Sequence, residues 1–150
     1  VTTEPDGAAL LSDGRAQERR EDGSASGSHP AWAPHMIQGW TPDFIPLVAQ
    51  ESIDKGYIDE VVPVSADTSF ATAQALAQKE GIFCGISCGA TFAAALDVAQ
   101  RAAPGSVILC TLPDTGERYL STPLFGDIEA EMTAEEWALA RSTPSAVLAA

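Results

Sequence analysis

Apolar and polar positions alternate along the middle of the chain in two periods, one typical of strands and one of helices. The run Ile58–Val64 (IDEVVPV) predicts a strand, and Ser65 after it is suited to cap a helix. That helix would extend to about Glu80, where Gly81 would end it. The apolar residues at helical spacing on one face are Phe70, Ala73, Leu76 and Ala77.

A second helix and a second apolar run follow a stretch punctuated by glycines. We expect the helix over Cys88–Arg101, which is rich in alanine and ends before Pro104. The run Ser106–Leu112 (SVILCTL) is apolar almost throughout, which is typical of a parallel strand buried on both faces. Strands that alternate with helices predict an α/β fold with a parallel sheet and covering helices.

The pattern divides the chain into four parts. Residues 1–5 are predicted to form a terminal strand, and residues 34–141 form the main body. Within that body, Thr133 would cap a last helix through Arg141. We expect residues 142–150 to be a loose tail.

Residues 6–33, which we call the insertion, are rich in Gly, Ser and acidic side chains. Because its few apolar residues cannot offset the entropy lost on ordering, we predict that this segment is exposed and disordered. The alternative is a short charged helix at Ala16–Glu21, although short isolated helices are marginal in water.

Composition narrows the classes of function. The net charge is -13, from 21 acidic and 8 basic residues, which argues against nucleic-acid binding and against an anionic membrane surface. No apolar run is long enough for a transmembrane helix, and no signal peptide is visible. Three cysteines do not form a disulfide framework and indicate an intracellular compartment: the cytoplasm, or a plastid or mitochondrion in a eukaryote.

The cysteines themselves predict no metal centre. Cys110 lies in the apolar run 106–112 and is interpreted as a small buried hydrophobic residue. Cys84 and Cys88 have neither a nearby histidine nor a second cysteine pair, so we expect no metal ligands.

Two loops lie where ligands bind in a parallel sheet, after the strands' carboxyl ends. In the first, Ser87 either caps the following helix or offers its hydroxyl to a ligand that Gly85 and Gly89 allow to approach closely. The second loop holds Asp114, Glu117 and Arg118 close together. Those three residues form either a solvated turn with a surface ion pair or a loop that closes a site.

Three longer motifs resemble those of the cysteine synthases, also called O-acetylserine sulfhydrylases. The stretch PHMIQG at 34–39, with FIP at 44–46, is similar to the family's PHKIQG…FIP. GIFCGISCGA at 81–90 is similar to G-I-x-x-G-I-S-S-G-A, and LPDTGERYLST at 112–122 is similar to LPSSGERYLST. Val1–Pro5 resembles a strand that ends in V-E-P. The chain thus resembles the C-terminal portion of a fold-type II enzyme that uses pyridoxal 5'-phosphate (PLP), within its tryptophan synthase β-like large domain.

The resemblance implies roles for six residues. Ser87 matches the serine that hydrogen-bonds the pyridine nitrogen of PLP, and Gly85, Ile86 and Gly89 would shape the cofactor pocket. Gly39, with its neighbour Gln38, matches the active-site loop near the bound amino acid. The family's Schiff-base lysine lies upstream of the matched region. Only Lys55 and Lys79 occur here and neither fits a cofactor-lysine motif, so we expect no catalytic residue and no activity from this chain alone.

The implied reaction replaces the acetate of O-acetyl-L-serine with sulfide to give L-cysteine. Family members are commonly homodimers, and the C-terminus of serine acetyltransferase is a further candidate partner. The alternatives are a cystathionine β-synthase, a serine/threonine dehydratase, or a non-catalytic truncated relative that binds serine acetyltransferase. This chain departs from the family at Asp114 and Thr115, where the family has Ser-Ser, and at Trp40–Asp43, where it has Ile-Gly-Ala-Gly. The second change would enlarge the loop beside Gly39.

Overall fold

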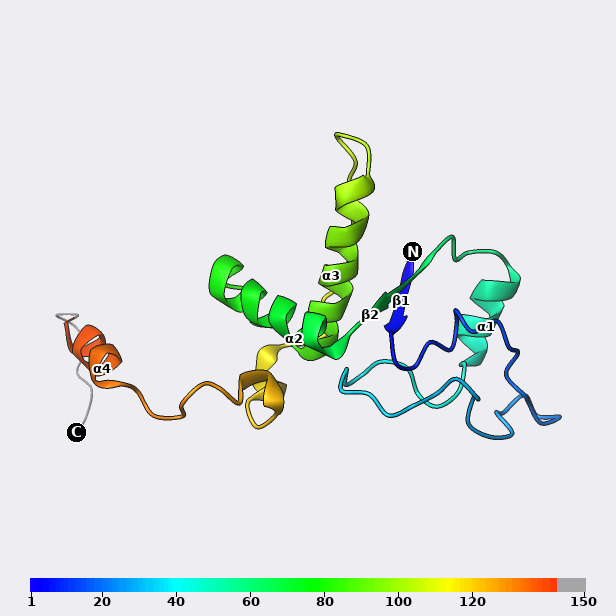
Figure 1. Cartoon of the computed structure of the whole chain (residues 1–150), viewed down its shortest axis with the longest axis horizontal. Coiled ribbons are helices and arrows are strands. Elements are labelled where there is room, and N and C mark those ends of the chain that lie inside the picture. The colour runs from blue at the N-terminus through cyan, green and yellow to red at the C-terminus, as the bar shows by residue number, and fades with distance from the viewer. Residues whose placement is uncertain (143–150) are drawn as a thin grey trace.

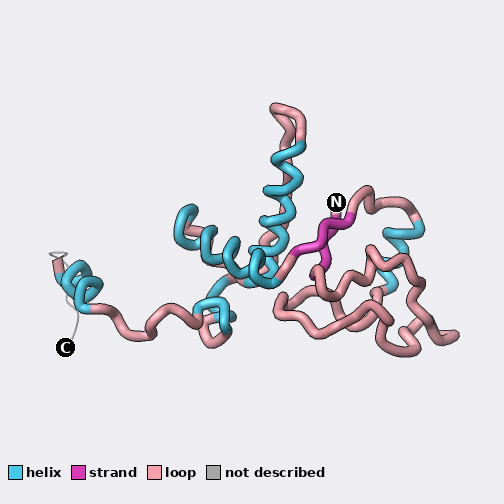
Figure 2. Tube along the Cα trace, viewed as in Figure 1, coloured by secondary structure: helices cyan, strands magenta, loops and turns pink. Residues whose placement is uncertain are grey.

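Two short parallel strands lie at the centre of the computed structural model, which describes residues 1–142 (Figures 1 and 2). β1 (Thr2–Pro5) pairs with β2 (Val61–Val64), so that Thr2 lies opposite Val61. The connection between them contains the insertion and α1 (Leu47–Asp54), a helix that the proline-broken sequence did not predict. Parallel strands, a long crossover and covering helices confirm the predicted α/β class.

The helix after β2 begins and ends as predicted. α2 (Ala66–Ala75) is capped by Ser65, whose hydroxyl oxygen accepts the Thr68 backbone N–H at 3.1 Å. It continues into a π-helical turn, η1 (Leu76–Glu80), and Gly81 then adopts a left-handed conformation with φ of 69°. Glycine suits that conformation because it lacks a Cβ atom.

α3 (Ile86–Arg101) packs across α2 and starts two residues earlier than the sequence predicted. Its N-cap is Gly85, so Ser87 lies inside the first turn. The main hydrophobic core fills the α2–α3 contact and extends to the strand end and to the segment after residue 118. Its buried members are Ile37, Val64, Ala73, Leu76, Cys84, Ile86, Cys88, Ala90, Ala94, Tyr119, Leu124 and Phe125.

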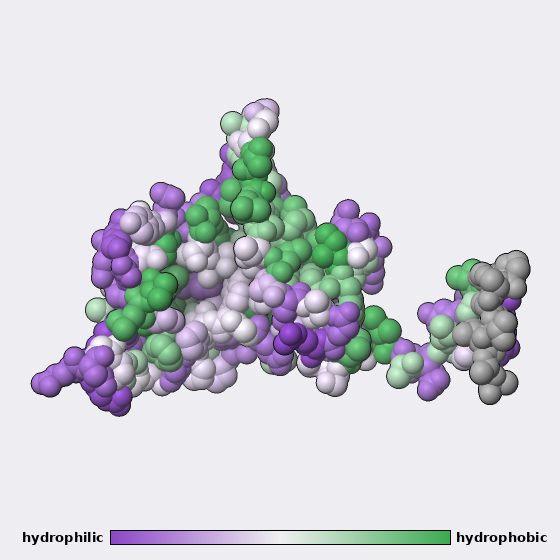
Figure 3. Space-filling model, turned by 180° about the vertical axis from the view of Figure 1, so that it is seen from behind, coloured by the Kyte–Doolittle hydropathy of each residue, from purple (hydrophilic) through white to green (hydrophobic). Residues whose placement is uncertain are grey.

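The prediction of a buried strand at Ser106–Leu112 is wrong. The segment has no strand structure, and Val107 and Leu109 are 96% and 93% exposed. A strand buried on both faces needs neighbours that complete its hydrogen bonds, and the described sheet contains only β1 and β2. Cys110 is accordingly only half-buried, which corrects the expectation of a buried cysteine. Hydrophobic surface lies along α3 and its surroundings in Figure 3.

The C-terminal part contains two short 3-10 turns and one capped helix. The turns are η2 (Gly116–Tyr119) and η3 (Pro123–Phe125). The last helix, α4 (Ala134–Arg141), starts at Thr133 with the predicted cap, because Thr133 and Glu136 exchange side-chain and backbone hydrogen bonds. Of the tail predicted to be loose, residues 143–150 lie outside the described residues.

The insertion has neither helix nor strand, so the alternative of a helix at Ala16–Glu21 is wrong. It is also less exposed than expected, because several of its side chains are buried: Ala8, Leu10, Gln17 and His29. Ala8 and Leu10 form a second small core with Ile45. The buried carboxylate of Glu4 at the end of β1 accepts the backbone N–H groups of Leu11 and Ser12. The insertion is thus attached to the sheet by polar contacts that hydrophobic patterning does not register.

None of the described helices is long and apolar enough to cross a lipid bilayer.

The close contact between α2 and α3 at Gly89 should make the stability of the chain sensitive to a side chain at this position. A Cβ atom at Gly89 would lie 2.1 Å from the Ser69 carbonyl oxygen and 2.7 Å from the Ala73 nitrogen. Both atoms belong to backbone, so they cannot rotate away. Gly89→Ala should therefore lower the free energy of unfolding by about 1–3 kcal/mol, measured by urea denaturation.

Gly7→Ala is the matched control, because nothing lies within 4 Å of the added atom. It should change the free energy of unfolding by less than about 0.5 kcal/mol. Equal effects of the two substitutions would contradict a close-packed helix crossing.

Candidate active site

Ser87 lies in the first turn of α3 and is 3% exposed. Its backbone carbonyl accepts the Thr91 hydroxyl at 3.0 Å, as in an ordinary helix turn. Its own hydroxyl does not cap the helix, because the N-cap is Gly85, and no residue in the described part of the chain hydrogen-bonds to it. The capping interpretation of Ser87 is therefore wrong, and the hydroxyl is left for a ligand to use.

Gly39 faces this hydroxyl from a distant part of the chain. A Cβ atom at position 39 would lie 3.8 Å from Ser87 Oγ, and the φ of 88° there is one that glycine adopts without strain. The structure thus brings together two residues that the sequence assigned to the cofactor pocket and to the substrate loop. Gln38, the other loop residue, is exposed.

The three remaining residues predicted for the pocket are all buried at the start of α3. Gly85 has no room for a side chain, since a Cβ atom would lie 2.3 Å from both Asp114 Oδ1 and the Tyr119 ring. Ile86 is 1% exposed, and its carbonyl accepts the hydroxyl of Ser69 from α2. Gly89 contacts the backbone of α2. These residues position the Ser87 turn.

The sequence did not identify a polar network around Asp114. Its carboxylate accepts the Tyr119 hydroxyl at 2.5 Å and the Cys88 thiol at 3.2 Å. The second loop is therefore not a solvated turn with an ion pair at Asp114, and Arg118 forms no salt bridge among the described residues. Asp114 instead joins this loop to the turn that carries Ser87.

The surroundings of Asp114 keep the neighbouring phenol and thiols protonated. Burial, followed by the hydrogen bond to Asp114, raises the pKa of the Tyr119 phenol to about 12. Burial and the adjacent Cys88 raise the pKa of the Cys84 thiol to about 12, and burial also raises that of Cys88. Thiols with raised pKa values are poor nucleophiles, which argues against catalysis by either cysteine. No group of metal ligands occurs within residues 1–142.

The site fits one side of a cofactor pocket. The Ser87 hydroxyl, on a residue that is 3% exposed, has no hydrogen-bond partner among residues 1–142 and lies opposite a glycine, which suits the polar edge of a flat ring. Neither lysine is placed to hold a cofactor at this point: Lys55 on the far side of β2 pairs with Glu51, and Lys79 is exposed on η1.

Comparison with known proteins identifies the class. Residues 1–114 match the family model described as pyridoxal-phosphate dependent enzyme. The chain belongs to this family, whose members use PLP.

Within the family the chain is similar to two kinds of synthase. It is 41% identical to O-ureido-L-serine synthase of Streptomyces lavendulae, over 97% of this chain and 38% of that protein. It is 40% identical to a probable cysteine synthase of Bacillus subtilis, over 63% of this chain and 29% of that protein. The chain therefore spans less than two fifths of the length of either relative.

Solved structures agree with the sequence matches. O-ureido-L-serine synthase superposes with a TM-score of 0.69 at 41% identity, over 93% of this chain and 38% of that structure. The cysteine synthase of Entamoeba histolytica gives a TM-score of 0.65 at 33% identity, over 89% and 34%. The resemblance to cysteine synthases read from the three motifs is thereby confirmed, as is the fold-type II class.

Titration of Tyr119 tests the Asp114 network. In a Tyr57→Phe background Tyr119 is the only tyrosine, and its phenolate absorbance should appear with a pKa of about 12. Asp114→Asn should lower that pKa, because the charge that opposes ionisation is lost. The pKa of Tyr119 in the folded chain lies above the ordinary 10.0, so the neutral phenol favours the folded state. This contribution of Tyr119 to the free energy of unfolding is fully present below about pH 10 and is lost as the pH rises towards 12.

Asp127→Asn is the control, since Asp127 makes no hydrogen bond to Tyr119. A pKa that is insensitive to Asp114→Asn would exclude the Asp114–Tyr119 contact.

Proposed function

We propose that this chain is the C-terminal part of a PLP-dependent enzyme that replaces the acetate of O-acetyl-L-serine with sulfide, giving L-cysteine and acetate. The observation that carries the proposal is the hydroxyl of Ser87, a residue that is 3% exposed: it neither caps its helix nor pairs with a described residue. The family match supports the cofactor, and the similarity to cysteine synthases supports the substrates.

The residues of the chain would act by binding and orientation. When bound, PLP supplies a ring that withdraws electrons from the reacting amino acid. Ser87 would donate its hydroxyl hydrogen to the ring nitrogen, or accept one there, without adding a charge. A neutral partner makes the ring a weaker electron acceptor than a carboxylate would, which suits β-replacement and limits side reactions. Gly39 would leave space for the amino acid beside the ring, because any side chain there would point at Ser87.

A second candidate product is an amino acid such as O-ureido-L-serine. The observation that favours it is coverage: the match to O-ureido-L-serine synthase extends over 97% of the chain, whereas the match to the Bacillus subtilis relative covers 63%. Both reactions replace a group at the β-carbon of a serine derivative. They differ in the nucleophile, which would be hydroxyurea for the ureido product.

A fusion enzyme tests the function. The 150-residue chain is joined to the N-terminal portion of O-ureido-L-serine synthase in place of the region that it matches, and PLP and O-acetyl-L-serine are added. Mass spectrometry should detect cysteine with sulfide, and O-ureidoserine with hydroxyurea if the second candidate holds. The non-catalytic alternative predicts neither product and instead binding to serine acetyltransferase, measured by titration calorimetry.

Substitution of Ser87 should impair this fusion enzyme. Ser87→Ala removes the hydroxyl and should lower kcat/KM roughly 10- to 100-fold, the cost of leaving a buried polar atom of the cofactor without a partner. Ser87→Thr keeps the hydroxyl and is the matched control, so it should retain most of the activity. The chain without its fusion partner should form no product, because neither Lys55 nor Lys79 lies at the site. Activity that survives Ser87→Ala would overturn the assigned role.

A further inference from the structure

The insertion contacts the loop that carries Gly39, which we call the substrate loop (residues 38–45). His29 donates its backbone N–H to the Asp43 carbonyl oxygen at 2.6 Å, and the Ser28 hydroxyl donates to the Asp43 carboxylate. Trp32 donates its indole Nε1–H to the Thr41 carbonyl oxygen at 3.3 Å. One edge of the substrate loop is therefore bound to the end of the insertion.

The far end of the substrate loop is held by the first half of the insertion. Ile45 donates its backbone N–H to Gln17 Oε1 at 3.0 Å, and its carbonyl accepts the Arg19 guanidinium at 2.7 Å. Gln17 is buried, and its amide nitrogen donates to the Gly27 carbonyl oxygen at 3.0 Å. Both backbone groups of Ile45 are thus satisfied by the insertion and not by a strand or helix.

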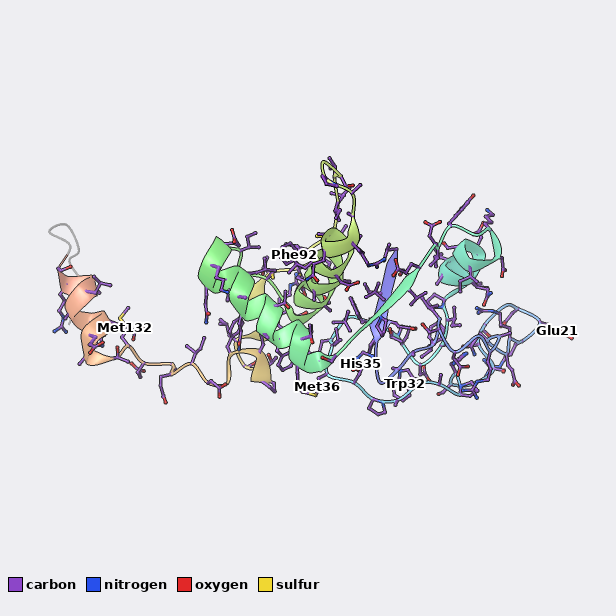
Figure 4. The ribbon with its side chains drawn as sticks, turned by 45° about the horizontal axis from the view of Figure 1, so that its top comes forward. Glu21, Trp32, His35, Met36, Phe92 and Met132 are labelled. Carbon is purple, nitrogen blue, oxygen red and sulfur yellow. The ribbon has the colours of Figure 1, made fainter. Side chains whose placement is uncertain are left out.

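Thr41 is the point of strain between these contacts. Its φ is 42°, the only positive value at a non-glycine residue in the described chain, and a β-branched residue rarely adopts it. Its carbonyl accepts two donors, the indole of Trp32 and Nε2 of His35 at 3.2 Å. Figure 4 labels Trp32 and His35 along the loop that leads to Gly39. Such strain persists where surrounding contacts impose it.

The strained residue lies two positions after Gly39, which faces Ser87 Oγ. A change in the backbone at Thr41 would therefore move Gly39 relative to the hydroxyl. The substrate loop also contains the four residues, Trp40–Asp43, at which the chain departs from the cysteine synthase motif.

We propose that Trp32 is a positioning residue of the candidate active site. Its indole N–H holds Thr41 in the left-handed conformation, and the insertion thereby fixes Gly39 opposite Ser87. This inference deepens the proposed function, since it assigns to the insertion the placement of the substrate loop.

The test uses the 150-residue chain labelled with ¹⁵N. Trp32→Phe keeps the aromatic ring in its small core but removes the donor. Amide exchange at residues 40–45 should become roughly two- to tenfold faster, the effect of losing one hydrogen bond, and the amide resonances of Gly39 and Ser87 should shift. The free energy of unfolding from urea denaturation should change little, which separates positioning from a general structural role.

Two further variants sharpen the result. Trp137→Phe in α4 is the matched control and should leave residues 39–45 and 87 unchanged, because Trp137 packs on Arg141 and lies far from the substrate loop. Adding Thr41→Gly to Trp32→Phe should return the amide resonances of Gly39 and Ser87 towards those of the original chain, since glycine adopts a φ of 42° without strain.

Titration with PLP separates this inference from the proposed function. In the fusion enzyme, the apparent Kd of PLP, followed by the absorbance of the bound cofactor, should rise at least threefold in Trp32→Phe and stay constant in Trp137→Phe. If Gly39 and Ser87 respond to Trp32→Phe in the chain but Ser87→Ala leaves the Kd of PLP in the fusion enzyme unchanged, the inference stands and the cofactor role of Ser87 is contradicted. If neither resonance nor the exchange at 40–45 responds to Trp32→Phe, the inference is overturned whatever PLP does.

Discussion

The hydrogen bond from the Ser69 hydroxyl to the Ile86 carbonyl oxygen joins α2 to the beginning of α3, and the rest of the site depends on it. Both residues are buried, and Gly89 lies one turn further along α3, where the backbone of α2 leaves no room for a Cβ atom. The contact fixes both where α3 starts and how its first turn is rotated. Because Ser87 follows Ile86 directly, its backbone is held in place before any ligand arrives.

The same turn is held from its other side by Asp114. The carboxylate lies beside the N-terminus of α3, where the helix dipole favours negative charge, and it accepts hydrogen bonds from Tyr119 and Cys88. In the cysteine synthase motifs the positions of Cys88 and Asp114 are both serine, and here the two altered residues contact each other. In this chain the thiol of Cys88 donates to the Asp114 carboxylate at 3.2 Å, which joins the two motifs at the start of α3.

Local signals predicted the local structure well. Ser65, Gly81 and Thr133 were each assigned from residue type and position, and each forms its cap through groups within a few residues. Ser87 was assigned to the pocket from a resemblance, while its own residue type favoured capping. The start of α3 at Ile86 decided against capping, because it moved the serine past the N-cap. The residues between Gly85 and Gly89 do not by themselves determine where α3 starts, because that position depends on the contact with Ser69 in α2.

Predictions failed where the partner lies far away in the chain. The apolar residues of Ser106–Leu112 suit a buried strand, but a strand also needs neighbouring strands to bond to. The described sheet contains only β1 and β2, and neither pairs with this segment. The insertion is less exposed than its composition indicates. Its backbone is bound by Glu4 of β1, and its Gln17 and Arg19 bind the backbone of Ile45. Side-chain to backbone bonds of this kind have no periodicity, so hydrophobic patterning cannot reveal them.

The strained conformation of Thr41 connects the insertion to the chemistry. Sequences tend to be locally consistent with their fold, and departures from that consistency concentrate at functional sites. A glycine at position 41 would adopt the same φ without strain, and the cysteine synthase motif does have glycines in this loop. In this chain the loop instead carries Trp40, Thr41 and Pro42, and the donors that stabilise it come from Trp32 and His35. The loop after Gly39 therefore keeps its shape through hydrogen bonds from the preceding segment and not through residues that adopt its backbone conformation without strain.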